Sequence, residues 1–527
     1  MRYVLPNVKL PFDVSPAELN TEIARMLAIA HADVNELKVL KRSVDSRNTR
    51  AVKFVYKVAF SSPLDLKKLE PFSQPRNPLE TAETGTEKLP ERPVVVGTGP
   101  AGLFAAVVLA EKGYKPLVLE MGPEMSERHA AAERTLAGDG FGEFPAFLYG
   151  EGGAGTYSDG KLTGRSAGEF GSFVLDFFAR HGAPSEIRTE AWPHIGSDRL
   201  RSVLPRIRKH LTSLGATFSF NSRVCAMKSR PEGWELTVDG DTLMASAVIF
   251  ACGQSSFESY QLLREAGIAL ETKPYQMGVR IEFPQLVAER WAYGKLALDH
   301  RLPRARFNMA FNDKIRGTSV HTFCNCPGGE VLPVPERPQT LCVNGMSNLN
   351  RNSQFSNTAL VTTLYGVDTG NDDPMSLLEH RLKVESEAYR AGGGELRAPA
   401  IAATDFARGD APSKLPDSSY KLGLEPADIS ELLPVHYVNT LRDALKYFDS
   451  RMKGVLGSES VLIAVESRSS SPVRVPREQT LEAKGTRGLY VVGEGSGYAG
   501  GIMSSAIDGL RAALHVAGRF APRAEMS

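Results

Sequence analysis

The chain has 527 residues, of which 42% are hydrophobic and 23% are charged, and its formal net charge is +1. This length suffices for roughly three domains, and the balanced charge excludes a protein drawn to nucleic acid or anionic membranes by its overall field. Five cysteines are too few for a disulfide framework and indicate a reducing compartment. The N-terminus has no secretory pattern and no apolar run is long enough for a membrane span, so we expect a cytoplasmic protein.

Residues 1–72 are predicted to form a small, basic α+β domain. Residues 2–10 have the pattern of a strand, and a helix is expected after Ser15, a candidate N-cap that precedes a proline. Two further strands are expected over 36–44 and 51–60, the second with apolar residues alternating on one face. The hairpin that they form is rich in lysine and arginine. It is either a contact for an acidic partner or RNA, or a solvated outer face, which charge runs more often are.

From Val94 the expected order becomes strand, glycine turn, helix and strand. The turn has the G-x-G-x-x-G spacing in its full context, between a buried strand and an apolar helix. Its first glycine permits a tight turn, its second lets the backbone approach a pyrophosphate, and its third lets the helix pack on the strand. The N-terminus of the helix then offers free N–H groups to phosphates. The residues of this turn are Gly97, Gly99, Pro100, Ala101 and Gly102.

An acidic residue, Glu120, ends the second strand, eighteen residues after the last glycine. A carboxylate at that place accepts hydrogen bonds from a ribose and disfavours a 2′-phosphate, because two anions repel each other. The dinucleotide is therefore NAD or FAD. A second complete G-x-G-x-x-G unit is not found between Gly122 and Leu489, so a separate NADPH domain is not expected.

The end of the chain repeats the order strand, glycine turn and helix. Here Gly493 and Glu494 follow the strand directly, and Gly500, Gly501 and Ile502 open an apolar helix. FAD is long enough to need a second element of this kind, whereas a nicotinamide dehydrogenase does not need one. The turn is expected at the ribityl chain and phosphate, and the positive end of the helix at the flavin pyrimidine, where it would stabilise charge at N1. The predicted cofactor is therefore FAD.

A further strand and turn, residues 247–253 with Gly253 at its end, is expected to pass near the dinucleotide. The predicted fold class is α/β: an FAD-binding Rossmann-like domain, an inserted α+β substrate domain and the small N-terminal α+β domain. The predicted division of the chain is a basic N-terminal domain over 1–72, a linker over 73–92, the first part of the FAD-binding domain over 93–272, the inserted domain over 273–440 and the C-terminal part of the FAD-binding domain over 441–527.

The chain resembles the two-dinucleotide-binding-domain flavoproteins, the glutathione-reductase-like superfamily, and within it a bacterial group labelled NAD(FAD)-utilizing dehydrogenases or FAD-dependent proteins. The stretches that carry this resemblance are GEGGAGTYSDGKL, PHIGSD, FCNCPGG, VESRSSSPVRVPR and GEGSGYAGGIMSSAIDG. The resemblance covers the whole chain and implies FAD, this fold and an oxidoreductase of undefined substrate. It also implies that Val224 holds the adenine through backbone groups. One departure is Glu494, because the superfamily usually has aspartate there; one extra methylene shifts that contact without abolishing it.

The loop GEGGAGTYSDGKL is expected to lie over the flavin ring. Its glycines Gly152, Gly153 and Gly155 permit close backbone approach. Ser158 and Lys161 offer hydrogen-bond donors to the flavin N5 or O4 or to a substrate anion. The alternative for Lys161 is a side chain that points to solvent.

The segment HTFCNCPGG contains His321, Cys324 and Cys326, and Cys342 follows further along. Three interpretations stay open. The first is a redox pair whose thiol pKa is lowered by His321, although a C-x-C pair closes a strained ring. The second is a metal site, although the spacing lacks a C-x-x-C knuckle. The third, which we favour, is that the cysteines pack as small apolar residues in a strand. We expect no metal, and the candidate catalytic residues are Lys161, His321, Cys324 and Cys326.

Three more side chains are candidates for orienting a carboxylate or carbonyl substrate: His194, Arg468 and Arg474. Arginine suits this role because its guanidinium holds a carboxylate with two hydrogen bonds. The two arginines serve equally well to brace the FAD diphosphate or a loop, so both interpretations stay open.

The predicted function is an FAD-dependent oxidoreductase, a dehydrogenase or reductase that transfers a hydride between an unidentified small organic substrate and flavin N5. NAD(P)H would bind transiently, if at all, and neither a nucleic acid nor a membrane is expected as a partner. One rival interpretation is an RNA-modifying flavoprotein whose basic N-terminal domain binds RNA. A second rival is a flavin-containing docking protein. The balanced overall charge argues against the RNA interpretation.

Overall fold

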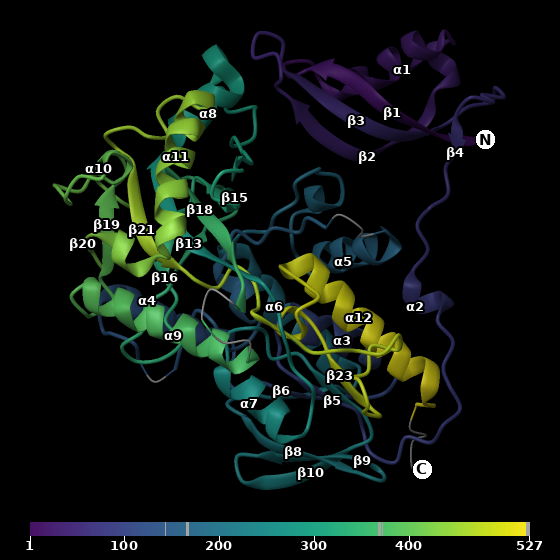
Figure 1. Cartoon of the computed structure of the whole chain (residues 1–527). Coiled ribbons are helices and arrows are strands. Elements are labelled where there is room, and N and C mark those ends of the chain that lie inside the picture. Colours follow the sequence, from purple (N-terminus) through teal and green to yellow (C-terminus); the bar gives the residue numbers. More distant parts are fainter. Residues whose placement is uncertain (143, 165–167, 367–369, 371–372, 523–527) are drawn as a thin grey trace.

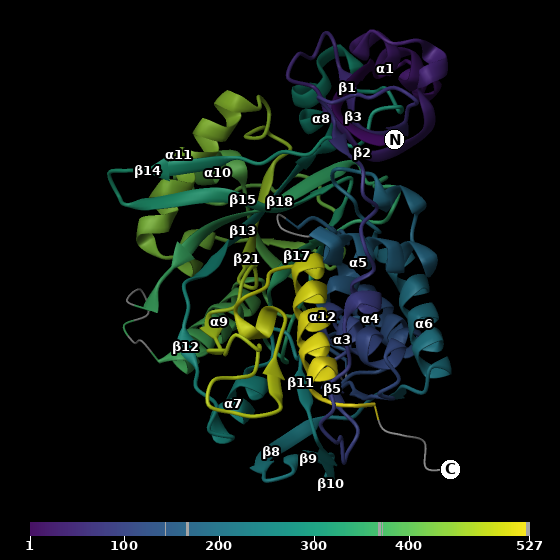
Figure 2. The ribbon, with the colours of Figure 1, turned by 90° about the vertical axis from the view of Figure 1, so that its right-hand side faces the viewer.

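The computed structural model describes residues 1–142, 144–164, 168–366, 370 and 373–522. Figure 1 shows three bodies. The first is a small N-terminal sheet with a helix, the second is a parallel sheet covered by helices that include the C-terminal helix, and the third is a larger sheet with its own helices. Figure 2, turned by 90°, shows the N-terminal sheet above the parallel-sheet body and beside helix α8 (Gln285–Tyr293) of the larger sheet. None of the described helices is both long and apolar enough to cross a membrane.

The N-terminal body contains β1 (Arg2–Pro11), α1 (Leu19–Leu27), β2 (Asn35–Asp45), β3 (Lys53–Ser61) and β4 (Glu70–Pro71). The strand order is β2-β3-β1-β4, and α1 packs on the sheet. The alternation expected for β3 is present, because Phe54, Tyr56 and Val58 are buried in the core of this body. Ser15 caps a short 3-10 turn that leads into α1, where its hydroxyl accepts a hydrogen bond from the Ala17 amide at 3.2 Å.

The second body is built on a parallel sheet of β5 (Val94–Val96), β6 (Leu117–Leu119), β7 (Thr217–Ser219), β11 (Val248–Phe250) and β23 (Leu489–Val491). Its order is β23-β11-β5-β6-β7, and every neighbouring pair is parallel. The two strands that precede the glycine turns, β5 and β23, therefore flank the same strand, although they lie far apart in the sequence. The Rossmann-like arrangement predicted from the sequence is confirmed.

Helices α3 (Pro100–Glu111) and α12 (Ile502–Arg519) follow the two glycine turns and pack side by side (Figure 1). Glycine permits their close approach, since a Cβ atom on Gly509 would lie 1.9 Å from the carbonyl oxygen of Ala101. A Cβ atom on Gly102 would lie 1.9 Å from the carbonyl oxygen of Gly97, so this glycine packs α3 onto its strand. The remaining elements of this body are α4 (Met125–Ala137), α5 (Gly168–Arg180), α6 (Ser197–Ser213), β8 (Val224–Arg230), β9 (Gly233–Val238), β10 (Asp241–Ala245) and α7 (Phe257–Glu265). A short helix, α2 (Pro78–Thr81), lies in the predicted linker.

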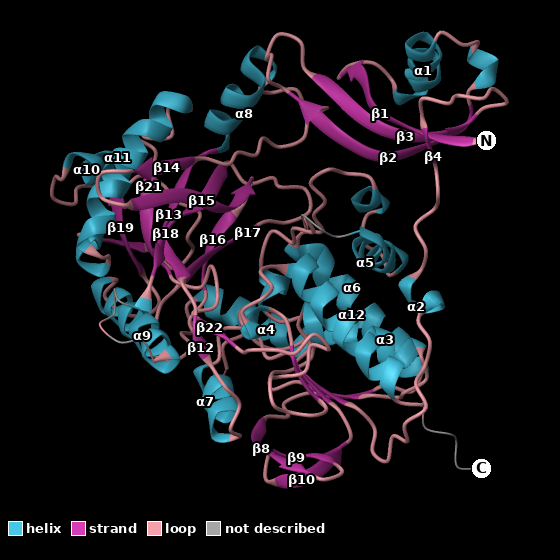
Figure 3. Ribbon diagram, turned by 45° about the vertical axis from the view of Figure 1, so that its right-hand side comes forward, coloured by secondary structure: helices cyan, strands magenta, loops and turns pink. Residues whose placement is uncertain are grey.

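The third body is a seven-stranded sheet in the order β14-β15-β18-β13-β21-β19-β20 (Figure 3). Its strands are β13 (Tyr275–Pro284), β14 (Ala310–Asp313), β15 (Thr318–Pro327), β18 (Phe355–Leu364), β19 (Ala398–Ala402), β20 (Leu424–Pro426) and β21 (Val461–Glu466). Its other elements are α8, α9 (Pro374–Ala391), α10 (Ala403–Arg408), α11 (Val435–Arg451) and the hairpin β16 (Glu330–Pro333) and β17 (Val343–Met346). A two-residue ladder of β12 (Glu271–Thr272) and β22 (Val473–Arg474) marks the connections to the second body. The predicted domain limit at residue 440 falls inside α11, and β21 continues the sheet beyond it.

Candidate functional site

A cavity of about 870 Å³ lies where the second and third bodies meet. It is lined by both glycine turns, through Gly97 and Gly99 on one side and Gly493 and Gly501 on the other. These residues follow the carboxyl ends of parallel strands, which is where α/β sheets bind their ligands. Cavities of this volume accommodate cofactor-sized molecules. The two distant turns therefore form a single site.

Two glycines at the cavity hold backbone conformations that side chains do not tolerate. Gly153 has φ 61° and ψ −166°, and Gly501 has φ 92° and ψ 172°. This region of backbone space is essentially restricted to glycine. A Cβ atom on Gly153 would also lie 3.0 Å from the Cα atom of Gly99, so the loop and the first glycine turn touch through bare backbone. The cradle consequently presents peptide groups, and not side chains, to a ligand.

The N-termini of α3 and α12 both open at this cavity, at Pro100 and Ile502. The N-cap residues of the two helices are Gly99 and Gly501, which have no side chain to accept from the first N–H groups, and no capping bond is found among the described residues. Such free donors, at the positive end of the helix dipole, are suited to phosphate and to other anionic groups. Two uncapped helix ends at one cavity fit a dinucleotide that carries charge at more than one place.

Glu120 lines the cavity at the end of β6 but is already engaged by the protein. One carboxylate oxygen accepts hydrogen bonds from the amide and hydroxyl of Thr98 at 2.9 and 2.7 Å, and the other accepts from the amides of Gly122 and Gly150 at 3.0 Å each. These four donors account for the acceptor sites of a carboxylate. Glu120 therefore joins the first glycine turn to the loop around Gly150. The sequence-based role at the ribose stays a prediction.

Glu494 and Gln254 face each other beside the second turn. The Glu494 carboxylate accepts a hydrogen bond from the Gly501 amide at 2.6 Å, and burial raises its pKa. Gln254 donates its amide to the carbonyl oxygen of Arg468 at 2.7 Å. Its own carbonyl oxygen is buried at the cavity with no hydrogen-bond partner among the described residues. An unused buried acceptor is costly, so this atom fits a site that a polar ligand completes.

Lys161 and Cys324 meet at the cavity from different bodies. The Lys161 backbone pairs with His194, and the Lys161 ammonium donates to the carbonyl oxygen of Asn325 and to the Cys324 sulfur, at 3.7 Å. Cys324 has φ 49° and lies where the pairing of β15 with β18 shifts in register, between Phe323 and Cys326. The irregular backbone of the bulge brings the thiol to the cavity and the ammonium.

The two groups stabilise each other's charge. A hydrogen bond with Cys326, together with the charges of Lys161 and Arg280, lowers the pKa of the Cys324 thiol well below its usual range, against the opposing effect of burial. Burial likewise opposes the charge on Lys161, but Cys324, Cys326 and Asp159 outweigh it and raise the Lys161 pKa. A thiolate stabilised by a lysine is nucleophilic and able to exchange protons.

His321 and Cys326 do not line the cavity. His321 pairs with Ala310 and Val361 within the sheet, and burial lowers its pKa. Cys326 is fully buried, and its thiol donates a hydrogen bond to the carbonyl oxygen of Cys324 at 3.4 Å. All five cysteines are free thiols. Among the described residues, no group of three or more His, Cys, Asp or Glu side chains is arranged to hold a metal ion.

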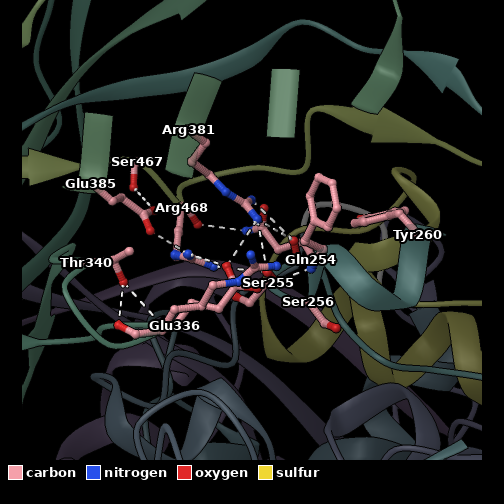
Figure 4. Close-up of polar contacts among 12 residues, drawn as sticks. Gln254, Ser255, Ser256, Tyr260, Glu336, Thr340, Arg381, Glu385, Ser467 and Arg468 are labelled. Carbon is pink, nitrogen blue, oxygen red and sulfur yellow. Dashed lines mark hydrogen bonds and ion pairs between the residues drawn. The ribbon is translucent and has the colours of Figure 1, made fainter. Parts of the chain in front are cut away.

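Arg468 lines the cavity but its guanidinium is committed to buried carboxylates (Figure 4). It lies 2.6 Å from Glu336 and 2.6 Å from Glu385, and it donates to the carbonyl oxygen of Ser255 at 3.2 Å. These contacts hold the loop at Ser255 against the third body, and the two roles that the sequence left open for this residue stay predictions. Arg474 stacks over Tyr498, 5.3 Å from the ring centroid.

The predicted site residues divide clearly. Those that line the cavity are Gly97, Gly99, Pro100, Ala101, Glu120, Gly153, Gly155, Ser158, Lys161, Val224, Gly253, Cys324, Gly493, Glu494, Gly500, Gly501 and Ile502. Those that do not line it are Gly102, Gly152, His321 and Cys326. Gly152 instead packs on α6, since its Cβ atom would lie 2.3 Å from Leu204. Cavity residues that sequence reasoning missed include Trp192, Gln254, Trp291 and Arg306, which belong to none of the motifs, and Phe323 and Asn325, which flank Cys324 within FCNCPGG but were not chosen as site residues.

Comparison with known proteins identifies three segments. Residues 274–469 match the family model of the FAD-dependent protein, C-terminal domain-like; residues 95–139 match an NAD(P)-binding Rossmann-like domain; and residues 5–61 match a domain of unknown function. An uncharacterized protein from Clostridium beijerinckii (strain ATCC 51743 / NCIMB 8052) is 34% identical over 528 residues, which covers 98% of this chain and 98% of that protein.

Among solved structures, CtdE in complex with FAD is 12% identical over 81% of this chain and 82% of that chain, with a TM-score of 0.31. Lactococcus lactis thioredoxin reductase is 15% identical over 31% of this chain and 35% of that chain, with a TM-score of 0.18. OTEMO in complex with FAD and NADP is 19% identical over 32% of this chain and 27% of that chain, with a TM-score of 0.21.

The fold and the cavity define a flavoprotein with a Rossmann-like dinucleotide-binding domain, and its cofactor is FAD. The match over the third body and the full-length relative then specify the family. The chain belongs to the FAD-dependent proteins that share this C-terminal domain. It is of the oxidoreductase type.

Proposed function

We propose that this protein is an oxidoreductase that transfers a hydride between a small organic substrate and N5 of FAD. The observation that carries the proposal is that one cavity runs from the two glycine turns to the Lys161–Cys324 pair. FAD, when bound, supplies the hydride acceptor or donor. The protein residues supply position, charge and a place for the proton.

Cys324 and Lys161 are the proposed catalytic residues. When a substrate carbon gives up a hydride, its hydroxyl or amine loses a proton, and the Cys324 thiolate accepts that proton at its sulfur. In the reverse direction the thiol returns the proton. The Lys161 ammonium, 3.7 Å from the sulfur, keeps the thiolate ionised and donates to a substrate oxygen.

Arg280 is the proposed positioning residue for this pair. It is fully buried, forms an ion pair with Glu466 at 2.9 Å and donates to the side-chain oxygen of Asn357 at 2.7 Å. It also donates to the carbonyl oxygen of Cys324 at 3.4 Å. These contacts anchor the bulge of β15 and thus the direction of the thiol.

The test is anaerobic mixing of the FAD-loaded protein with NADH, NADPH and a panel of reduced metabolites, followed by flavin absorbance. A donor that bleaches the flavin band identifies the reductant. With an alcohol or amine donor, whose oxidation releases a proton, Lys161→Met and Cys324→Ala should slow the bleaching at least tenfold, within the range of acid–base catalysis. Lys228→Met, on the exposed surface of β8, is the matched control and should behave as the parent protein. Bleaching that is equally fast in both site variants would refute the assigned roles.

A further inference from the structure

The aromatic residues at the cavity indicate the kind of substrate that enters it. The chain has three tryptophans, and two of them, Trp192 and Trp291, line the cavity while 55% and 41% exposed. Phe323 lines the same cavity and is 39% exposed. Large aromatic side chains are highly buried on average, so three exposed ones around one opening mark a binding surface.

These three side chains come from both bodies that form the cavity. Trp192 lies in the second body, two residues before His194, which pairs with Lys161. Trp291 lies on α8 and Phe323 on β15, both in the third body, and Phe323 precedes Cys324. The aromatic surface is therefore continuous with the proposed catalytic pair.

The N-terminal body holds both tryptophan-bearing segments. The amide of Ala191 donates to the carbonyl oxygen of Arg42 at 2.8 Å, next to Trp192. A Cβ atom on Gly294, three residues after Trp291, would lie 3.2 Å from the side chain of Thr49. The hairpin of the N-terminal body thus contacts the chain beside each tryptophan.

Beside the Lys161–Cys324 pair, two arginines share one buried carboxylate. Asp159 is buried and pairs with Arg351 at 2.6 Å and with Arg306 at 3.2 Å, so one carboxylate faces two arginines. The Lys161 ammonium contacts the Cys324 sulfur at 3.7 Å. Of the two arginines, Arg306 lines the cavity. Its contact with the shared Asp159 is the longer of the two, so Arg306 is the arginine placed to take a second carboxylate from the cavity, and a guanidinium is well suited to that ligand.

We propose that the substrate is a flat aromatic carboxylate, whose ring stacks on the side chains of Trp192, Trp291 and Phe323 and whose carboxylate binds Arg306. The inference rests on the proposed function, because it names the substrate class of that same site. A flat ring packs against the aromatic side chains, and the anionic end pairs with Arg306, so a single molecule satisfies both features.

The test compares three probes on the full-length, FAD-loaded protein by calorimetry and by tryptophan fluorescence. Naphthoate has both the ring and the charge, naphthylmethanol has no charge, and cyclohexanecarboxylate has no aromatic ring. Naphthoate should bind at least about tenfold more tightly than either of the others. Because Trp234 is 1% exposed in a separate core, quenching by the probe reports on the two tryptophans at the cavity.

Two variants separate the two halves of the proposal. Arg306→Gln should weaken naphthoate about tenfold or more and leave naphthylmethanol unchanged. Trp192→Ala should weaken both by about threefold to tenfold. Trp234→Phe is the control and should leave all affinities unchanged, and thermal melting of each variant verifies folding.

Equal affinity for the three probes, or naphthoate binding that neither site variant weakens, would overturn the substrate class. Preferential binding of a single-stranded RNA oligomer over naphthoate would also overturn it. Calorimetry measures binding without turnover, so the proposed substrate class and the proposed reaction are tested independently. Flavin that no donor reduces contradicts the reaction, while absent probe discrimination contradicts the substrate class.

Discussion

Replacing Arg468 with methionine tests the charge cluster beside the cavity. Arg468, Glu336 and Glu385 are 6%, 2% and 0% exposed, and both carboxylates lie 2.6 Å from the guanidinium (Figure 4). Methionine has a similar length but carries no charge, so the two carboxylates lose their shared partner while the volume changes little. Arg381 stays 3.9 Å from Glu336 and offsets part of the loss.

Removing one partner of a buried ion pair costs about 3–5 kcal/mol, because the other charge stays buried and unpaired. For a domain of roughly 150–250 residues, 1 kcal/mol corresponds to about 2–4 °C in melting temperature. We therefore expect the third body of Arg468→Met to melt roughly 6–20 °C below the parent protein near neutral pH. Differential scanning calorimetry measures this shift.

The difference should depend on pH in a defined direction. In the parent protein burial opposes ionisation of Glu336, but Arg468 and Arg381 outweigh it and lower the Glu336 pKa. Its charge thus stabilises the fold above the unfolded pKa, and this contribution is lost as pH falls through the folded pKa. Without Arg468, burial raises the Glu336 pKa above the unfolded value. Protonation of Glu336 then removes an unfavourable buried charge and stabilises the folded variant. The gap in melting temperature should narrow as pH falls from about 8 to about 5.

Two controls decide the interpretation. Arg25→Met removes an exposed arginine that pairs with Glu22, and its melting temperature should change by less than about 2 °C, because surface pairs contribute little. Adding Glu336→Gln and Glu385→Gln to Arg468→Met should recover part of the loss. If Arg468→Met melts within about 2 °C of the parent protein at neutral pH, the assigned cost of the buried charges is refuted.

Two further predictions concern the cradle and the thiol. Gly501→Ala forces a side chain into a glycine-only conformation at a cost of about 1–3 kcal/mol and should weaken FAD binding about five- to hundredfold in a fluorescence titration. The control is Gly138→Ala, which is also at positive φ in open space but lies away from the cavity and should leave FAD binding unchanged. Equal effects of the two variants would contradict the role of Gly501 in binding FAD. The second variant starts from Cys225→Ala, which removes the exposed thiol. Cys324 should still react with iodoacetamide near pH 6.5, because its lowered pKa keeps the reactive thiolate populated at a pH where an ordinary cysteine is protonated. Lys161→Met should cut that rate at least tenfold by mass spectrometry, and identical pH profiles in the two proteins would count against the pairing.

The glycine turns were predictable because their requirement is local. A G-x-G-x-x-G turn has to reverse the backbone within a few residues, and only glycine at Gly97 and Gly102 permits the tight turn and the close packing of helix on strand, so the sequence alone indicates it. The same holds for the turn at Gly493. We predicted that both turns bind one cofactor because FAD is long enough to need two such elements. The strand order β23-β11-β5 places the two turns on one sheet, as this prediction requires.

The rest of the site was not predictable, because it depends on how the bodies meet. His321 was chosen for its closeness to Cys324 in the sequence, but residues three apart in a strand point to opposite faces. The register shift between Phe323 and Cys326 then brings Cys324, with Asn325 beside it, to the cavity, while His321 stays in the regular part of the strand. Lys161, which the thiol does meet, lies 163 residues away. Trp192 lies just before the PHIGSD stretch and Trp291 lies in no motif, and neither surrounding sequence signals a cavity-lining aromatic side chain.

Buried charges explain how the two halves of the cavity keep their relative position. β21 ends at Glu466, and the chain then returns from the third body to the second. Within this short crossing, Glu466 pairs with Arg280, and Arg468 pairs with Glu336 and Glu385. Apolar contacts would tolerate sliding, whereas a buried ion pair is favourable in one geometry. Since the Arg468 carbonyl also accepts from Gln254 beside the second glycine turn, the crossing ties the cofactor end of the cavity to the sheet that carries Cys324.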